Sequence, residues 1–303
     1  KYTAGPGMIE FRQAICKKLK LENGLDYSTD EILVSNGEKQ SLSTACQALF
    51  GQGDEVIVFQ PYWVSFPEFI RLADAEPLLI NTLPEKNFEP DFEELMSKYI
   101  KAVKVVILNS PSIPTGGVWG KNDLVRMLEI AKKHNWIVIS DECYERLVYD
   151  GEFISTEKIN QDYNINATVV TCLSLSKTYA MTGWRIGYSA GPASILTAMA
   201  KILGQATSCA NSIGQFAGIE ALSGSQECVE QMRNAFKRRR DLIVHLLNDL
   251  PNVSCAIPGG AFYVFPNFEK SLGKTGNGEL LKDTFDISEY ILESAKGVTV
   301  PGD

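Results

Sequence analysis

Seven apolar, β-rich runs alternate with helix-period segments, and this alternation constrains the fold more than any other feature of the chain. The predicted strands are 31–35, 54–59, 77–81, 103–109, 136–141, 168–174 and 185–190. Apolar residues recur at helical spacing between them, in segments 39–50, 90–99, 121–134 and 193–204. Continuous apolar strands that alternate with helices predict an α/β domain with a largely parallel, buried sheet.

The pattern changes after residue 225. A long helix is expected at about 226–250, then short strands at 253–256 and 261–265, then a helix at 285–296. The glycine-rich segment 273–280 is typical of a flexible loop. A length of 303 residues favours two units, so we expect a large domain at 1–245 and a small α+β domain over 246–303.

Composition excludes several functional classes. The net charge is −8, which argues against a nucleic-acid partner, and the basic run 237–240 is interpreted as a solvated helix face. The sequence contains no run of about 18 apolar residues, so no membrane span is expected. Seven cysteines without CxxC spacing and two histidines argue against a zinc site and for a reducing compartment. We expect the cytoplasm, or an organelle such as the plastid if a targeting segment has been lost.

Ligands in open α/β sheets gather at the carboxyl ends of strands. The segment SNGEKQ, 35–40, places a glycine turn between a strand and a helix, whose N-terminal N–H groups favour an anion such as phosphate. By itself, a segment of this kind is more often a plain turn than an anion-binding site. The loop NSPSIPTGG, 109–117, is fixed by two prolines and two glycines, and alone it indicates no chemistry.

A carboxylate and a phenol follow the strand 136–141. Asp141 ends this apolar strand, where a buried carboxylate is costly unless it meets a cation or a donor. Tyr144 lies close enough to point into the same cleft. The alternative is that Asp141 caps a following helix, and the segment alone does not separate the two interpretations.

A lysine follows the strand 168–174. Lys177 has Ser174 and Ser176 before it and Arg185 eight residues after, and these hydroxyls and the guanidinium could hold a phosphate. A lysine in a loop is usually only solvated, but a desolvated lysine near other cations can act as an amine nucleophile.

Together these groups are the set that pyridoxal phosphate requires. The cofactor aldehyde condenses with a lysine, a carboxylate keeps the ring nitrogen protonated, and a phenol hydrogen-bonds the ring hydroxyl. Trp63, in FQPYWVSF, is the candidate for an aromatic ring stacked on the cofactor.

The order and spacing of eight motifs resemble the fold-type I pyridoxal-phosphate aminotransferases of class I/II. The chain is most similar to the Ib subgroup, which holds aspartate and aspartate/glutamate–prephenate aminotransferases. The motifs are YTAGPGMIEFRQAI, ILVSNGEKQSL, GDEVIVFQPYWVSFPE, ILNSPSIPTGGV, ISDECYERLVY, LSKTYAMTGWRIGY, PGGAFYVF and VTVPGD. The resemblance implies a mostly parallel seven-stranded sheet flanked by helices, plus a small α+β domain that is incomplete here.

The implied activity is a ping-pong transamination between aspartate or glutamate and a 2-oxo acid, such as 2-oxoglutarate, oxaloacetate or prephenate. By position, the resemblance assigns Lys177 as the Schiff-base lysine and the proton carrier. It assigns Asp141 to the ring nitrogen, Tyr144 to the ring hydroxyl, and Ser174 and Arg185 to the phosphate.

Further roles follow from the same resemblance. Backbone N–H groups near Gly37 and Glu38 complete the phosphate site, and Trp63 stacks on the ring. Tyr2 matches a tyrosine that reaches the phosphate of the neighbouring subunit, which implies a homodimer with shared sites. Lys39 matches the lysine that contacts the distal carboxylate of dicarboxylic or prephenate-like substrates; the alternative is a solvated helix-start lysine.

Three departures from the family pattern stand out. Ile113 replaces the asparagine that usually precedes PTG, and an apolar side chain cannot donate to the ring hydroxyl. Glu38 replaces alanine or glycine, so its carboxylate is expected to point away from the phosphate or to repel it. The sequence ends at Asp303, before the arginine that clamps the substrate α-carboxylate, and the N-terminal segment that closes over the substrate is also absent.

These departures keep two alternatives open. One is another fold-type I activity, such as an aromatic aminotransferase or a lyase. The other is a degenerate paralogue that binds the cofactor and dimerises but turns over poorly.

Overall fold

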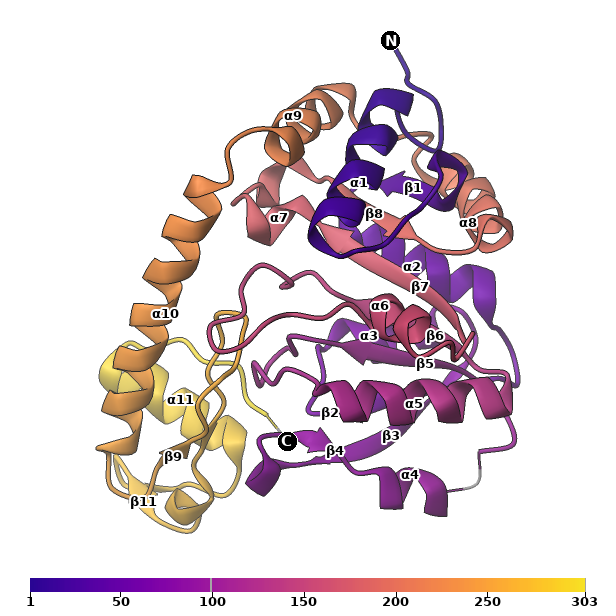
Figure 1. Cartoon of the computed structure of the whole chain (residues 1–303). Coiled ribbons are helices and arrows are strands. Elements are labelled where there is room, and N and C mark those ends of the chain that lie inside the picture. The colour runs from indigo at the N-terminus through magenta and orange to yellow at the C-terminus, as the bar shows by residue number, and fades with distance from the viewer. Residues whose placement is uncertain (99, 303) are drawn as a thin grey trace.

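One eight-stranded mixed sheet organises the chain (Figure 1). The computed structural model describes residues 1–98 and 100–302. In spatial order the strands are β1 (Ile32–Ser35), β8 (Gly187–Ala190), β7 (Thr168–Ser174), β6 (Ile137–Asp141), β5 (Val103–Asn109), β2 (Glu55–Gln60), β3 (Glu76–Leu83) and β4 (Glu89–Pro90). The five from β7 to β3 pair in parallel, whereas β8, β1 and β4 each pair antiparallel. The predicted α/β class and the seven predicted strands are confirmed.

The implied number of seven strands is wrong, because β4 adds an eighth. Asn87 and Phe88 have left-handed backbone, with φ values of 56° and 63°, and they turn the chain back on itself after β3. The two residues of β4 then pair with Thr82 and Leu83. A two-residue strand after such a turn has too little periodicity to be recognised in a sequence.

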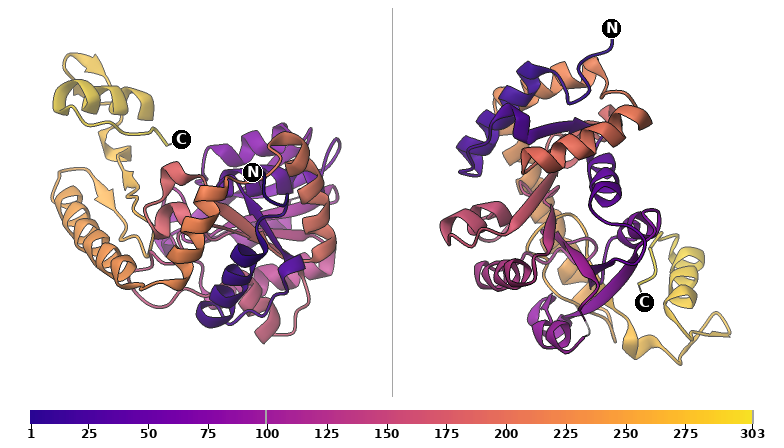
Figure 2. Two further views of the ribbon diagram at one scale, coloured as in Figure 1. Left: turned by 90° about the horizontal axis from the view of Figure 1, so that it is seen from above. Right: turned by 90° about the vertical axis from the view of Figure 1, so that its right-hand side faces the viewer.

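Helices cover both faces of the sheet (Figures 1 and 2). One face carries α2 (Glu38–Leu49), α3 (Ser65–Arg71) and α8 (Ala193–Ala206), and the other carries α1 (Ile9–Glu22), α4 (Phe92–Ser97), α5 (Lys121–His134) and α6 (Thr156–Asp162). Short 3-10 helices lie at η1 (Thr29–Glu31), η2 (Pro84–Lys86), η3 (Thr182–Trp184) and η4 (Glu269–Ser271). Successive strand residues alternate between the two cores, as β2 illustrates with Val56 and Val58 on one side and Ile57 on the other.

The predicted helices within this domain are confirmed, with small shifts at their ends. The helix predicted at 90–99 is shorter, since α4 ends at Ser97, and residue 99 lies outside the described residues. Asn135 ends α5 in a left-handed conformation, with φ of 56°, which stops further helical bonding. Among the described residues, no helix is both long and apolar enough to cross a membrane.

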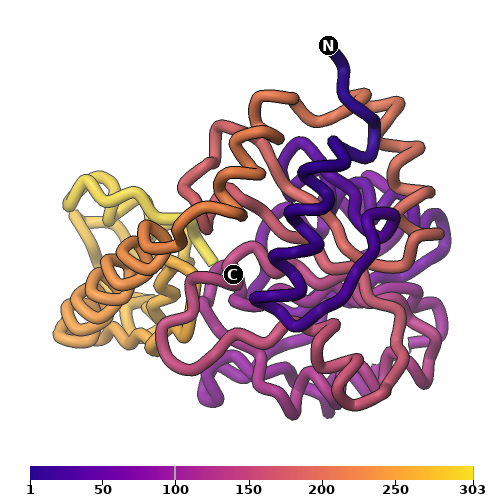
Figure 3. Tube along the Cα trace, turned by 45° about the horizontal axis from the view of Figure 1, so that its top comes forward, coloured from indigo at the N-terminus to yellow at the C-terminus, as the bar shows by residue number. Residues whose placement is uncertain are grey.

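Two helices lead from the sheet to the C-terminal part of the chain. The first, α9 (Ser212–Ser223), packs on α1, and α10 (Glu227–Asn248) then runs outward toward the last segments (Figure 3). The solvated face expected for 237–240 is wrong for Arg240, which is only 8% exposed. Its guanidinium pairs with Asp150 and donates to the Pro258 carbonyl at 2.9 Å.

The C-terminal part holds α11 (Thr284–Ala295) and two small hairpins (Figures 1 and 3). The hairpins are β9 (Ser254–Cys255) with β10 (Pro266–Asn267), and β11 (Thr275–Gly276) with β12 (Glu279–Leu280). The flexible loop expected at 273–280 is therefore wrong, because these residues form a tight hairpin. Its turn uses Asn277 and Gly278, both with positive φ.

The strand expected at 261–265 is also wrong. Ala261 has a φ of 59°, and this left-handed residue interrupts any extended run. Its amide donates to the Leu147 carbonyl at 2.9 Å, which ties the segment to the region after β6. Long-range packing, rather than local β propensity, sets the conformation of this segment.

Candidate active site

Three strands bring polar residues to one edge of the sheet. β6 ends at Asp141 and β7 ends at Ser174, and the two strands are parallel. Gly187, the first residue of β8, pairs with both Ser174 and Ser35, the last residue of β1. The ends of β1, β6 and β7 therefore lie at the same edge, as expected for the ligand edge of an open α/β sheet.

The N-terminus of α2 forms a close-packed backbone cradle at this edge. Gly37 precedes the helix with a φ of 79°, a conformation that favours glycine. A Cβ added to Gly187 would overlap the backbone nitrogen of Glu38 and would lie 2.7 Å from the Gly37 carbonyl carbon. A Cβ added to Gly37 would overlap the Arg185 guanidinium, so this cation lies directly against the helix N-terminus. Helix N–H groups and a guanidinium together suit a phosphate.

Ser174 and Lys177 stand beside this cradle. Ser174 caps the short helix α7 (Leu175–Thr178), and its Oγ accepts from the Ser176 amide at 3.0 Å. Lys177 is half-buried, and its Nζ lies 5.2 Å from the ring centre of Phe262 and 5.9 Å from that of Tyr144. The lysine predicted from the sequence thus points into an aromatic pocket.

Asp141 is a buried carboxylate with few donors. It is 1% exposed, and its Oδ1 accepts from the Cys143 amide at 3.2 Å. Burial raises the pKa of Asp141 above its usual value, and the hydrogen bond from the Cys143 amide opposes that rise. The interpretation of Asp141 as a helix cap is wrong, because the chain continues as a turn after β6.

Glu38 extends into the interior of the site. It is 8% exposed, and one of its carboxyl oxygens lies within 4.8 Å of an Asp141 oxygen and of the Cys143 thiol. Burial raises the pKa of Glu38 well above its usual value, and the charge of Asp141 raises it further. The side chain of Glu38 thus turns inward, toward Asp141.

An aromatic cluster encloses Tyr144, which is completely buried. Its hydroxyl shares a hydrogen bond of 2.7 Å with the hydroxyl of Tyr263, and its ring meets Phe262 edge-on at 5.2 Å. Burial raises the pKa of Tyr144 far above its usual value. Sequence reasoning missed Tyr263 and Phe262, although both lie in the motif PGGAFYVF, and the aromatic residues of that motif were the available signal.

Ile113 packs on the same cluster. Its half-buried side chain lies against buried residues that include Tyr144, Leu147 and Ala261. Its amide donates to Asn109 Oδ1 at 2.7 Å. Position 113 thus faces the predicted site with an apolar side chain that offers no hydrogen bond.

Lys39 and Trp63 meet at the entrance to the site. Lys39 is exposed, and its Nζ lies 4.8 Å from the Trp63 ring centre. Trp63 is half-buried and meets Phe66 edge-on at 5.4 Å. Tyr2 is 88% exposed and lines a surface groove that also includes Asn36, next to Gly37.

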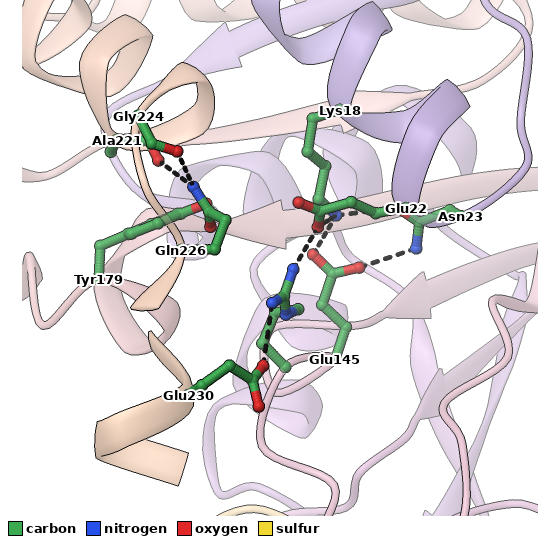
Figure 4. A network of polar contacts seen from close by, with 10 residues as sticks. Lys18, Glu22, Asn23, Glu145, Tyr179, Ala221, Gly224, Gln226 and Glu230 are labelled. Atoms are coloured by element: carbon green, nitrogen blue, oxygen red, sulfur yellow. Dashed lines mark hydrogen bonds and ion pairs between the residues drawn. The ribbon is translucent and has the colours of Figure 1, made fainter. Parts of the chain in front are cut away.

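A polar network joins the segment that carries Tyr144 to helices α1 and α10 (Figure 4). Glu145, 7% exposed at its side chain, pairs with Lys18 of α1, whose side chain is 3% exposed. Arg146 pairs with Glu22 of α1 at 2.7 Å and with Glu230 of α10 at 3.2 Å. Helices α1 and α10 therefore both hold the segment that follows β6.

The same figure shows how α7 is tied to the start of α10. Gln226 donates to the Ala221 and Gly224 carbonyls at 3.0 Å, and it accepts from the Tyr179 hydroxyl at 2.9 Å. Tyr179 follows the last residue of α7. The network thus fixes the helix that carries Lys177 as well as the segment that carries Tyr144.

The donor set fits pyridoxal phosphate. A cradle too tight for a Cβ at Gly187, with Arg185 against it, suits the phosphate. Asp141 provides a buried acceptor for a protonated ring nitrogen, and Lys177 provides the amine. Two residues fit less well: Ile113 offers no donor, and Glu38 adds a second buried carboxyl group beside Asp141.

Comparisons with known proteins agree with this geometry. The model of the family described as aminotransferase class I and II matches residues 1–302. An aspartate/prephenate aminotransferase of Cereibacter sphaeroides is 42% identical, over 99% of this chain and 75% of its own length. An aspartate aminotransferase of Rhizobium meliloti is 40% identical, over 100% of this chain and 74% of its own length.

Solved structures agree as well. The aspartate aminotransferase of Rhizobium meliloti superimposes with a TM-score of 0.95 at 39% identity, over 100% of this chain and 76% of that one. A mutant of the Thermus thermophilus aspartate aminotransferase superimposes with a TM-score of 0.91 at 37% identity, over 100% of this chain and 76% of that one.

Proposed function

Because the chain belongs to the class I and II aminotransferase family, we propose that it moves an amino group between aspartate or glutamate and a 2-oxo acid, with pyridoxal 5'-phosphate as cofactor. One observation carries the proposal. A lysine, a buried carboxylate, a buried phenol and an arginine-lined helix N-terminus converge at one edge of the sheet. The names of relatives at about 40% identity, aspartate and aspartate/prephenate aminotransferases, support the substrate class.

The phosphate of the cofactor would be held by α2 and its neighbours. The Glu38 backbone N–H, the Arg185 guanidinium and the Ser174 hydroxyl would hold it. The Gly37 N–H donates to the Ser35 carbonyl at 2.9 Å, so Gly37 would contribute the close approach of its backbone rather than a free donor. Asp141 would accept a hydrogen bond from the ring nitrogen. When bound, the cofactor supplies an electron sink for negative charge at the substrate α-carbon.

Lys177 would carry the proton of the reaction. Its Nζ lies against the rings of Phe262 and Tyr144, which keep bulk water from that side of the amine. From this position Lys177 would take a proton from the substrate α-carbon and deliver it to the aldehyde carbon of the cofactor. Tyr144, held by Tyr263, would orient the ring hydroxyl through its own hydroxyl.

Substrate selection would rest on Lys39. An exposed ammonium group at the entrance, fixed over the Trp63 ring, offers charge for the distal carboxylate of a dicarboxylic substrate. Replacement of Lys39 by methionine should raise KM for aspartate and leave a neutral amino acid little affected. An equal effect on both substrates would argue for a solvated surface lysine.

We also propose a homodimer with shared sites. Tyr2 lines the groove beside Gly37, and it, Ile213 and Phe216 leave 88%, 75% and 62% of their surfaces exposed. A second copy of this chain is the occupant that would cover them and bring its Tyr2 to the phosphate.

Two further expectations remain proposals. One is the division of the chain into a large and a small domain at residue 245. The other is a reducing compartment, the cytoplasm or a plastid-like organelle, which the seven free thiols support.

The visible absorption spectrum of the protein with pyridoxal phosphate tests the proposal. The wild type should gain a band that survives gel filtration, and borohydride reduction should fix the cofactor mass on the peptide that holds Lys177. Lys177→Ala should lose both signals, whereas Lys201→Ala, on the exposed side of α8, should keep them. Added aspartate should convert the band to that of the aminated cofactor.

The degenerate paralogue remains the second candidate, because Ile113 removes a donor and Glu38 adds a carboxyl group. It predicts that the cofactor band forms but that no amino acid changes it. Conversion by an aromatic amino acid and not by aspartate would instead indicate an aromatic aminotransferase, and loss of a substrate fragment without amination would indicate a lyase.

A further inference from the structure

Two buried carboxyl groups face each other where the proposed site needs only one. Glu38 is 8% exposed and Asp141 is 1% exposed. Their nearest ligand oxygens and the Cys143 thiol all lie within 4.8 Å of one another. Oε1 of Glu38 has no hydrogen-bond partner and is shielded from water. Glu55 and Glu142 also carry a buried oxygen without a partner, but of the three only Glu38, a side chain more than nine-tenths buried, belongs to the cluster with Asp141 and Cys143.

Two negative charges at this separation repel strongly in a buried setting. Within the described residues, neither carboxylate forms an ion pair with a lysine or an arginine. The other titratable groups around the pair are Glu142, which adds negative charge, and Cys143, Cys172, Tyr144 and Tyr263. The charge of Lys177 acts on Cys143. The pair must therefore retain a proton.

The hydrogen bonds decide which carboxyl group holds this proton. Asp141 Oδ1 accepts from the Cys143 amide, which stabilises the ionised form of Asp141. The N-terminus of α2 favours an anion at Glu38, but the side chain leaves that N-terminus and extends toward Asp141. Burial and the charge of Asp141 both raise the pKa of Glu38, and Oε1 of Glu38 accepts no hydrogen bond that would stabilise its ionised form.

We propose that Glu38 is a neutral carboxylic acid that donates a hydrogen bond to the Asp141 carboxylate and thereby fixes Asp141 for the ring nitrogen of the cofactor. Glu38 is a positioning residue in this arrangement, since it acts through Asp141. The role of Asp141 toward the ring nitrogen rests on the proposed function, whereas the protonation of Glu38 and its hydrogen bond to Asp141 do not. A neutral Glu38 also leaves the helix N-terminus free to bind phosphate, which an ionised Glu38 would repel.

The protonation of Glu38 can be measured without cofactor. Infrared spectra of the apo protein at pH 7 should contain a carboxylic-acid C=O band that both Glu38→Gln and Glu38→Ala lose. Glu142→Gln is the matched control, because Glu142 is a second buried acid beside the site and its band must be distinguished from that of Glu38. Spectra of the two Glu38 variants that retain every band of the wild type would overturn the proposal.

The holoenzyme tests the link to Asp141. Glutamine is a neutral donor of the same shape as protonated glutamate, so the pH midpoint of the cofactor band in Glu38→Gln should match the wild type. If Glu38 were ionised, removing its charge would shift that midpoint by about one pH unit or more. Such a shift in Glu38→Gln would refute the proposal. If the wild type binds no cofactor, the proposed function fails, and the infrared result still decides the protonation of Glu38.

Discussion

Replacement of Lys18 by methionine tests the polar network behind the site (Figure 4). The Lys18 ammonium and the Glu145 carboxylate form an ion pair whose side chains are 3% and 7% exposed. Asn23 completes it: its Oδ1 accepts from Lys18 at 2.9 Å and its Nδ2 donates to Glu145 at 2.8 Å. Methionine keeps much of the apolar volume of lysine and removes the charge, so the variant leaves a buried carboxylate without its cation.

We expect Lys18→Met to lose a large part of the unfolding free energy. Removing one partner of a buried ion pair costs about 3–5 kcal/mol, because the remaining charge stays desolvated. Total stabilities are about 5–15 kcal/mol, so this loss is a substantial fraction of the whole. The same helix supplies a matched control, since Lys20 pairs with Asp26 at 2.7 Å while the two side chains are 63% and 77% exposed. Lys20→Met should cost less than about 1 kcal/mol.

Urea unfolding, followed by tryptophan fluorescence, compares the two variants. The double variant Lys18→Met/Glu145→Leu replaces the pair by apolar side chains and should recover most of the loss. Near-equal unfolding free energies for Lys18→Met and Lys20→Met would refute the reasoning. A double variant no more stable than Lys18→Met would assign the loss to packing rather than to the unpaired charge.

Three further predictions follow from the site. Ile113→Asn should raise turnover about 2- to 10-fold, since one new hydrogen bond contributes about 0.5–1.5 kcal/mol; Ile113→Val is the control, and an unchanged or lower rate would contradict this account. Gly187→Ala should weaken cofactor binding about 5- to 150-fold, since its Cβ overlaps the Glu38 amide and such overpacking costs about 1–3 kcal/mol; Gly204→Ala, with open space around it, should bind normally in equilibrium dialysis. Burial raises the pKa of Glu142 from 4.5 to about 7, so its contribution to stability is complete below pH 4.5 and is lost as the pH rises through 7. Over this range the wild type should therefore lose about 3 kcal/mol more unfolding free energy than Glu142→Gln, which keeps only the decline that Glu38 and other groups cause.

The strands of the sheet were predictable because their signal is local. Each of the seven predicted strands is a buried apolar run, and the structure places each within a few residues of its predicted range. The strand-end rule also predicts that Asp141, Ser174 and Lys177 lie at one edge of the sheet. Strand β4 and the hairpin at 275–280 were missed, because left-handed residues and two-residue pairings leave no periodic pattern.

Contacts across long sequence separations were less predictable. The hydroxyl of Tyr263 meets that of Tyr144, which lies more than a hundred residues earlier, and no local pattern pairs the two. Segment 261–265 has strong β propensity, yet Ala261 adopts a left-handed backbone to pack on this region. The inward direction of Glu38 depends on the buried surroundings of Asp141, which the residues next to Glu38 do not encode.

The pairing of β1 imposes an order on folding during synthesis. In the sheet β1 pairs only with β8, and Ser35 meets Gly187, about 150 residues later. At synthesis rates of about 5–20 residues per second, β1 waits roughly 10–30 seconds for its partner, and its unpaired edge is open to other chains during that time. Arg185 and Gly187 pack against Gly37 and Glu38, so a nascent chain acquires the geometry of the proposed phosphate site only when β8 has left the ribosome.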